Sequence, residues 1–225
     1  MERHFDQELA ELKTDLLHMG VFVEDAIAKS VDSLRQLDAK KAGEVIDDDK
    51  IIDDWENQLD EKGLDLLALR QPMASDLRFI AMSMKITTDL ERMADLAVDI
   101  AQRVLDLAGK PLLKPLVDIP KLAELSQLMT RNVISAFVDG DVKLAESMIA
   151  VDQQADLLRN AVQQELINEY MAKDASTAER AVPLLLVARH LERICDHATN
   201  IAEDVIFMFS AKVVKHHPEK LTQSL

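Results

Sequence analysis

The stretch Leu90–Ala101, which reads LERMADLAVDIA, returns near the end of the chain as LERICDHATNIA at Leu191–Ala202. Seven of the twelve positions are identical, and the two copies lie 101 residues apart. In both copies the apolar residues are spaced by three and four positions, which is typical of a helix that packs lengthwise in a bundle. The repeat therefore predicts a tandem duplication of one helical unit of about 100 residues.

The composition favours an all-α protein and excludes several other classes. The 225 residues include only 5 glycines and 4% aromatic residues, whereas strand-rich folds use glycine in turns and favour aromatic and β-branched side chains. Disorder is excluded because 48% of the residues are apolar, and a disulfide scaffold is excluded because Cys195 is the single cysteine. The net charge of −15 argues against nucleic-acid binding, which needs a basic surface.

Helix breakers divide the chain into six expected helices. The segment from Gly109 to Pro120 contains three prolines, and such a segment cannot remain helical. Asp38 is a candidate N-cap, and Ser176 with Glu179 has the spacing of a capping box. The expected helices are 4–37, 39–69, 73–108, 121–138, 142–173 and 177–213. We therefore predict two tandem three-helix bundles of long antiparallel helices: a first repeat at 1–108, a proline-rich linker at 109–120, a second repeat at 121–213 and a polar tail at 214–225.

Acidic residues recur at positions i and i+4 in both halves. The repeat aligns Glu91 and Asp95 with Glu192 and Asp196, on the side of the helix away from the apolar stripe. A weaker match aligns the pair 49/53 with the pair 152/156. Such neighbours repel each other by a few tenths of a kcal/mol, so nearby arginines such as Arg92 or a bound cation would compensate. Carboxylate oxygens suit Mg²⁺, Ca²⁺, Mn²⁺ or iron. The alternative is a solvated acidic surface, which the spacing alone favours for all four pairs. The repeat strengthens the case for metal binding at Glu91/Asp95 and Glu192/Asp196, whereas a solvated surface is still favoured for the pairs 49/53 and 152/156.

Catalysis has little support in the sequence. It contains no Gly-rich phosphate loop and no Glu-x-x-His motif, so we expect no enzyme. Cys195 lies beside an acidic residue, which makes a nucleophilic thiolate improbable. We expect His190 and His197 to be packed or partly exposed, and His216 and His217 fall in the polar tail. A metal-dependent hydrolase would need a cavity and a general base, and the sequence suggests neither.

The sequence also predicts a cytoplasmic protein. The N-terminus has no apolar export segment, and the longest apolar run, 181–188, is far shorter than the roughly 18 residues of a spanning helix. A lone free thiol fits the same compartment. Because the negative charge disfavours anionic lipid, any membrane association should run through a protein partner.

The string RQPMASDLR at Arg70–Arg78, followed by the duplicated L-E-R-[MI]-x-D, resembles the PhoU family of accessory regulators of high-affinity phosphate transport. The resemblance covers nearly the whole chain. It implies two similar three-helix bundles whose E/D-x-x-x-D motifs bind metal ions. The ligands that it implies are Asp49, Asp53, Glu91 and Asp95 in the first half and Asp152, Asp156, Glu192 and Asp196 in the second, with a divalent or iron-type ion of unspecified identity.

The resemblance further implies a negative regulator of phosphate uptake and of phosphate-starvation signalling. Its expected partners are the ATPase subunit of a phosphate ABC transporter, a phosphate sensor histidine kinase and a second copy of the chain in a homodimer. Two alternatives stay open: an accessory regulator of a secondary phosphate transporter, and a helical metal-binding protein without a regulatory role. The RQP string could equally serve a helix joint or a partner contact.

Two positions distinguish the halves within this resemblance. Asp99 offers a possible extra ligand one turn beyond Asp95, whereas the second half has the neutral Asn200 there. Arg189 stands where the first half has Thr88, and a nearby guanidinium should weaken cation binding in the second half.

Overall fold

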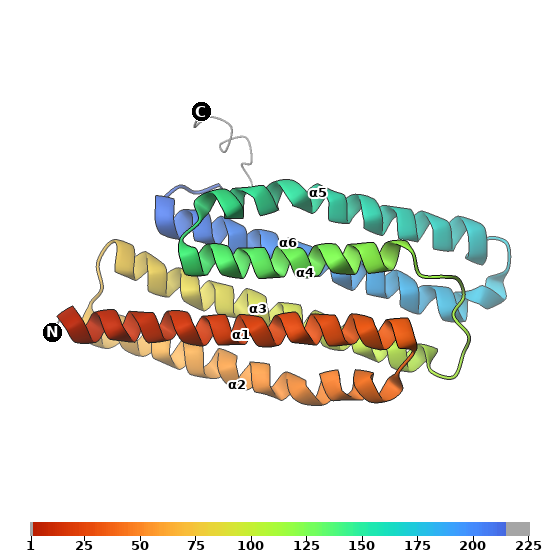
Figure 1. Ribbon diagram of the computed structural model, residues 1–225, viewed down its shortest axis with the longest axis horizontal. Coiled ribbons are helices and arrows are strands. Elements are labelled where there is room, and N and C mark those ends of the chain that lie inside the picture. Colours follow the sequence, from red (N-terminus) through yellow and green to blue (C-terminus); the bar gives the residue numbers. More distant parts are fainter. Residues whose placement is uncertain (1, 215–225) are drawn as a thin grey trace.

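The computed structural model describes residues 2–214, and within them the chain forms six long helices and no strand (Figure 1). This confirms the predicted all-α class and six-helix count. His216 and His217, and all of the predicted tail but its first residue, lie outside the described range. The helices are α1 (Glu2–Gln36), α2 (Ala39–Arg70), α3 (Ser75–Leu107), α4 (Asp118–Asp139), α5 (Val142–Glu165) and α6 (Ala178–Ser210).

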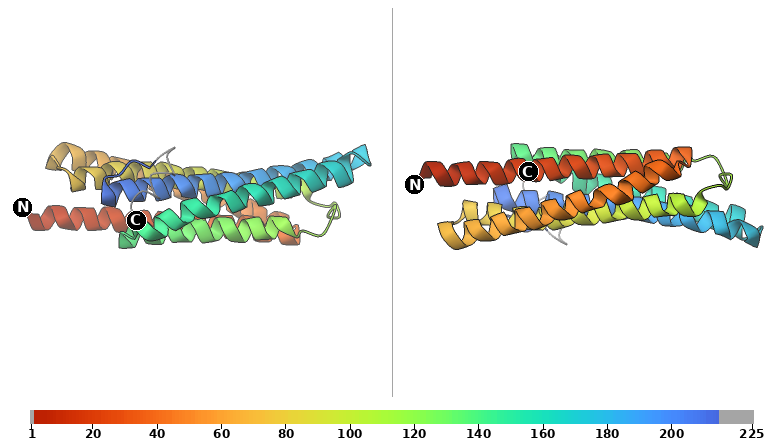
Figure 2. Two further views of the ribbon diagram at one scale, coloured as in Figure 1. Left: turned by 90° about the horizontal axis from the view of Figure 1, so that it is seen from above. Right: turned by 90° about the horizontal axis from the view of Figure 1, so that it is seen from below.

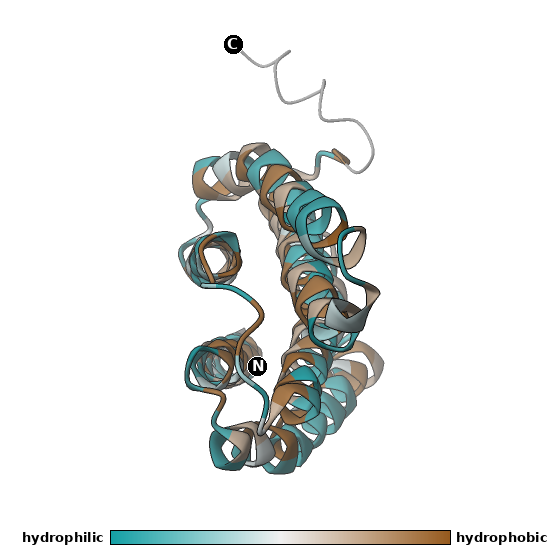
Figure 3. Cartoon of the chain, turned by 90° about the vertical axis from the view of Figure 1, so that its right-hand side faces the viewer, coloured by the Kyte–Doolittle hydropathy of each residue, from teal (hydrophilic) through white to brown (hydrophobic). Residues whose placement is uncertain are grey.

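Each half is a three-helix bundle, and the halves pack side by side (Figures 1 and 2). Helices α3 and α6 share the most extensive contact in the molecule, and α1 with α4 forms the second contact between the halves. Viewed from the end, α2 and α5 occupy opposite outer edges (Figure 3), and they do not touch each other. The edges formed by α2/α3 and by α5/α6 are therefore separate surfaces.

The apolar stripes of α3 and α6 form the centre of the core. Their burial removes apolar surface from water, which stabilises the fold by roughly 25 cal/mol per Å². The three-and-four spacing continues beyond both copies of the repeat, and every member of the two stripes is buried: Ile86, Leu90, Met93, Ala97, Ile100, Val104 and Leu107 in α3, and Val187, Leu191, Ile194, Ala198, Ile201, Val205 and Met208 in α6.

Polar contacts fix the antiparallel register of α3 and α6. Lys85 pairs with Asp204 at one end of the contact. Asp89 Oδ1 accepts a hydrogen bond from Asn200 Nδ2 at 3.3 Å and lies 2.7 Å from His197 Nδ1. Because His197 is only 17% exposed at this interface, its predicted packing is confirmed.

The helix ends differ from the predicted boundaries in several places. Pro120 lies in the first turn of α4 rather than in the linker, because a residue there needs no N–H donor. Helix α5 ends at Glu165 and continues as a π-helix at Leu166–Met171, where a continuous α-helix to residue 173 was predicted. Helix α3 begins at Ser75, because Gln71 and Ala74 on either side of Pro72 have left-handed φ values of 48°.

The predicted caps have different outcomes. The Asp38 carboxylate accepts hydrogen bonds from the backbone N–H groups of Lys40 and Lys41, which confirms it as the N-cap of α2. The capping box at Ser176 is wrong. Instead, the Asp174 carboxylate accepts from the Ser176 N–H at 2.9 Å, and a short 3₁₀ turn, Ala175–Thr177, leads into α6. None of the helices within residues 2–214 combines the length and the apolarity needed to cross a bilayer.

Candidate functional site: two acidic edges

The packing of α2 against α3 brings the two acidic pairs of the first half together. We call this group, Asp49, Asp53, Glu91 and Asp95, the first acidic cluster. Burial, followed by the charges of Asp53 and Asp95, raises the pKa of Asp49 to about 6. The cluster therefore joins carboxylates from both helices within electrostatic reach.

Within the first acidic cluster, Glu91 combines a raised pKa with a buried carboxylate oxygen that has no hydrogen-bond donor. Burial, followed by the Asp95 charge, raises the pKa of Glu91 to about 7, although Arg92 opposes the shift. Its side chain is 13% exposed, and its buried Oε2 has no hydrogen-bond partner; Arg92 Nε lies 3.4 Å away. Arg92 instead donates a hydrogen bond to Asp95 at 3.1 Å. A buried carboxylate oxygen without a donor provides a ready ligand for a cation.

Two further acids, Glu56 and Asp60, extend this edge along α2. Burial and the neighbouring Asp60 raise the pKa of Glu56, and burial raises the pKa of Asp60. The sequence analysis missed both residues. The signal was present, because together with Asp49 and Asp53 they follow the three-and-four spacing of one helix face.

The equivalent second acidic cluster, Asp152, Asp156, Glu192 and Asp196, lies between α5 and α6. Burial, followed by the charges of Glu192 and Asp152, raises the pKa of Asp196 to about 6. Burial, followed by the charge of Asp156, also raises the pKa of Asp152. The structure thus brings the second pair of acidic motifs together as it does the first.

Arg159 makes the second acidic cluster chemically different from the first. Its Nη2 donates to Glu192 Oε1 at 3.2 Å and lies 3.5 Å from Asp156 Oδ1, so one guanidinium links both helices. The repeat places Glu56 at the corresponding position of the first half. Sequence reasoning missed Arg159, although aligning α2 with α5 at the offset of their acidic pairs would have revealed the exchange.

The capacity for metal differs between the two clusters. As the side chains stand, no group of three or more His, Cys, Asp or Glu within residues 2–214 is arranged to hold an ion. The first cluster offers oxygen donors and an unsatisfied Glu91 oxygen, which fit a hard cation. In the second, Arg159 already supplies a positive charge.

The possible extra ligand Asp99 lies 3.6 Å from His190 Nδ1 across the α3–α6 interface. The side chain of His190 is 14% exposed there, so it is packed as expected.

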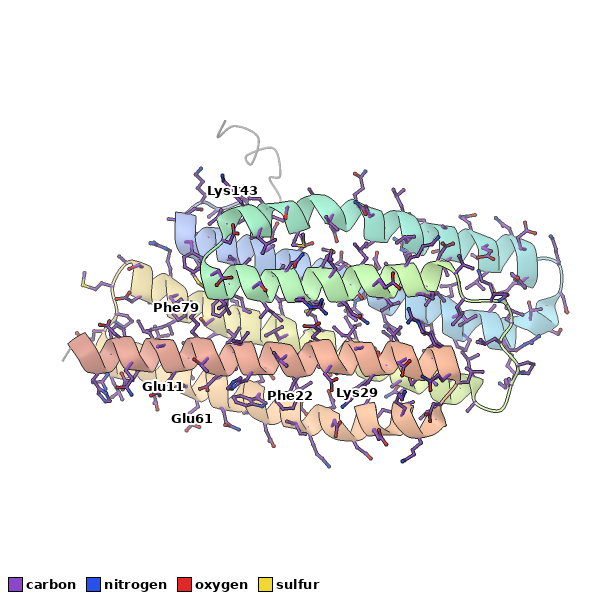
Figure 4. All side chains as sticks on the ribbon, viewed as in Figure 1. Glu11, Phe22, Lys29, Glu61, Phe79 and Lys143 are labelled. Atoms are coloured by element: carbon purple, nitrogen blue, oxygen red, sulfur yellow. The ribbon has the colours of Figure 1, made fainter. Side chains whose placement is uncertain are left out.

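A small cavity of about 60 Å³ adjoins Asp49 between α1, α2 and α3. Phe22 and Lys29 reach it from α1, at the edge where Figure 4 labels them. Lys29 is already neutralised by Asp25 at 2.7 Å and Asp48 at 3.6 Å. The cavity is too small for an organic substrate, so it adds no catalytic pocket to the first acidic cluster.

Cys195 lies inside the second half beneath the acidic edge. Its side chain is fully buried, and burial together with the nearby acids raises the pKa of the thiol strongly. A thiol that stays protonated and inaccessible is a poor nucleophile. This agrees with the expectation that a nucleophilic thiolate is improbable at Cys195.

Known proteins are similar to this chain in both sequence and fold. The PhoU domain model matches residues 16–104 and again residues 119–205. A phosphate-specific transport system accessory protein PhoU homolog from Rhizobium meliloti is 38% identical over 91% of this chain and 86% of its own length. The homolog from Aquifex aeolicus is 39% identical over 93% of this chain and 95% of its own length.

Two solved structures have the same architecture. The crystal structure of PhoU from Pseudomonas aeruginosa superposes with a TM-score of 0.89 at 34% identity, covering 92% of this chain and all of that one. The phosphate transport system regulatory protein PhoU from Streptococcus pneumoniae gives 0.87 at 30% identity, covering 93% of this chain and 99% of that one. With two matched domains, relatives along nearly the full length and the same six-helix fold, the chain belongs to the PhoU family.

Proposed function

We propose that this protein is an accessory regulator of a phosphate-specific transport system. The observation that supports the proposal most directly is the match to relatives with that description over more than nine-tenths of the chain. The protein would act at the cytoplasmic face as a homodimer that contacts the transporter's ATPase subunit and a sensor histidine kinase. Through these contacts it would lower phosphate uptake and hold the starvation response in its repressed state.

A helical adaptor needs surfaces rather than an active site, and the outer edges supply them. Acidic edges on α2/α3 and α5/α6 are complementary to basic surfaces of a partner, and such complementarity sets specificity and association rate more than affinity. The acidic edges are separate surfaces, since α2 and α5 do not touch. One copy of the chain could therefore bind two partners at once.

Deletion of the gene in the native host tests the regulatory role. We expect phosphate-starvation genes to be expressed in phosphate-rich medium and phosphate uptake to increase. Restoring the intact gene should reverse both effects. If the starvation genes stay silent in the deletion strain, the protein is not a repressor of that response.

We further propose that the first acidic cluster binds a divalent or iron-type cation. Asp49, Asp53, Glu91 and Asp95 would hold it, and the ion would neutralise carboxylates that otherwise repel each other across α2 and α3. Its role would be electrostatic and structural. In the second half the corresponding residues would bind a cation more weakly, because Arg159 already engages Glu192 and Asp156.

Metal analysis of the purified protein tests this proposal. Glu91→Ala combined with Asp95→Ala should remove the metal without unfolding the chain. The matched control is Glu11→Ala combined with Asp15→Ala, an acidic pair of the same spacing on α1; Figure 4 labels Glu11. The control should retain its metal. A metal-free wild type after reconstitution, or equal loss in the control, would rule out the site.

A further inference from the structure

A large basic hollow lies on the second half, beside the second acidic cluster. Its volume is about 450 Å³, and it lies between α5 and α6, which form the upper part of the bundle in Figure 1. Three guanidinium groups, one amide and two carboxylates line it: Arg159 and Gln163 from α5, and Arg189, Glu192, Arg193 and Asp196 from α6. Three cations around one hollow are unusual in a chain with a net charge of −15.

The three arginines are not equivalent. Arg159 is half-buried and held by Glu192 and Asp156. Arg189 and Arg193 are exposed, and neither forms an ion pair with any residue in the described part of the chain. They lie one turn apart on α6, so their charges repel by a few tenths of a kcal/mol. Neutralising the acidic cluster therefore explains Arg159 but not Arg189 or Arg193.

The first half has different charges at the equivalent positions, although the repeat provides the same scaffold. At the positions of Arg159, Gln163 and Arg189 it has Glu56, Asp60 and Thr88, and only Arg92 matches Arg193. The first half therefore has two acids, one neutral residue and one base at these four positions, whereas the second half has three bases and one neutral amide. The formal charge of these four positions changes from −1 to +3. This charge difference between the halves is concentrated around the hollow, which indicates that the hollow requires positive charge.

We infer that this hollow binds a tetrahedral oxyanion. Planar guanidinium groups donate paired hydrogen bonds to phosphate-type oxygens, and two of them one turn apart can grip one anion from the same side. The Gln163 amide can donate a further bond from the opposite helix. Arg159 is a positioning residue whose guanidinium is fixed by Glu192. The oxyanion is either free inorganic phosphate or the phosphoryl group of a nucleotide.

The inference goes beyond the proposed function and does not depend on the metal site. Arg189 and Arg193 belong to neither acidic cluster, so an anion could bind to protein from which metal has been removed. Binding would give the second half a response to an anionic ligand that the first half lacks. The carboxylates of Glu192 and Asp196 on the same wall reduce the positive potential of the hollow.

Isothermal titration calorimetry on the full chain tests the inference, with chelator present and ionic strength held constant. Inorganic phosphate is the first probe and ATP the second. We expect one phosphate per chain, and an affinity about tenfold lower in Arg189→Thr, because a lost hydrogen bond to a charged group has about that effect. The matched control, Arg92→Gln at the equivalent place in the first half, should change the affinity less than twofold.

The two ligand sources give different results. If ATP competes with phosphate and binds more tightly, the oxyanion is the phosphoryl group of a nucleotide; if it does not compete, free phosphate is the ligand. Absence of binding by both probes would overturn the inference, as would equal losses in Arg189→Thr and Arg92→Gln. These outcomes do not involve the transporter or kinase, so they are distinguishable from failure of the proposed function.

Discussion

Replacing Glu91 by glutamine should stabilise the metal-free protein at pH 8 and change little at pH 5. The folded state raises the pKa of Glu91 from its ordinary 4.5 to about 7, mainly through burial. The folded protein therefore binds this proton more tightly than the unfolded chain does, and stability is lost as the pH rises toward and through 7. Glutamine does not titrate, so it resembles the protonated acid at every pH.

The magnitude follows from that pKa. Each pH unit by which a pKa is raised corresponds to about 1.4 kcal/mol, which sets an upper limit of about 3 kcal/mol for Glu91 at pH 8. Water reaches 13% of the side chain, and Arg92 lies 3.4 Å away. Both reduce the penalty, so we expect Glu91→Gln to raise the free energy of unfolding by about 1–2 kcal/mol at pH 8.

Urea unfolding followed by circular dichroism, at pH 5 and pH 8 with a chelator, measures this difference. The control is Glu192→Gln at the equivalent position, which removes the negative charge that pairs with Arg159 and should destabilise the protein by about 1 kcal/mol at pH 8. A gain for Glu91→Gln that is the same at both pH values would refute the burial argument. A loss at pH 8 would show that the charged form of Glu91 is stabilising.

Three further predictions concern the core. Gly20→Ala would bring a Cβ within 2.6 Å of Ile134 Cδ1 at the contact between the halves and should lower the free energy of unfolding by about 1–3 kcal/mol. Gly43→Ala would place a Cβ with no atom within 4 Å and should raise the free energy of unfolding by about 0.5–1 kcal/mol. The reverse order of their melting temperatures would contradict the packing. Phe137→Ala should cost about 3–5 kcal/mol in urea unfolding, because the ring is fully buried and stacks on a second phenylalanine; a loss below 1 kcal/mol would mean that the site collapses freely. Cys195 should react with a thiol reagent only in urea, and rapid modification of the folded protein would contradict its burial.

The sequence predicted the fold well where one periodic signal dominates. The stripe that contains Leu90 and the matching stripe that contains Leu191 both became core, because a three-and-four spacing leaves a helix only one way to bury its apolar side. Asp38 was predictable for a similar reason: a short carboxylate just before a helix can reach the first free N–H groups.

Helix ends were less predictable because local and tertiary effects compete there. Pro120 disfavours a helix interior but is compatible with a first turn, and only the structure decides which of these applies. At the end of α5, the linker residue Lys114 is buried in an ion pair with Glu165, where the α-helix gives way to the π-helix. That contact joins residues 51 positions apart, and no short-range pattern reveals it.

The sequence predicted which acidic residues form the candidate sites, but it did not predict the net charge around each site. The acidic motifs converge as their spacing suggested, yet Glu56 and Arg159 lie one turn beyond the motifs of α2 and α5 and face Glu91 and Glu192 on the adjacent helix. Which residue faces a cluster from the adjacent helix depends on packing register, so it is invisible within a single motif. The duplication supplies the missing information, since comparing the halves position by position isolates the exchange of Glu56 for Arg159.

The location of this exchange has a physical cause. Stripe residues of α3 and α6 pack into one shared core, so a change in one half disturbs the other. The edges on α2 and α5 have no contact with each other, and charges at exposed, separated surfaces are screened by salt over about 8–10 Å. A duplicated bundle can therefore keep its core and change one edge at little cost to the fold. On that basis Glu56→Arg should make the first acidic cluster resemble the second, lowering its metal affinity while leaving the melting temperature within a few degrees of the wild type. Retained metal affinity in that variant would show that a guanidinium at this position does not compete with the cation.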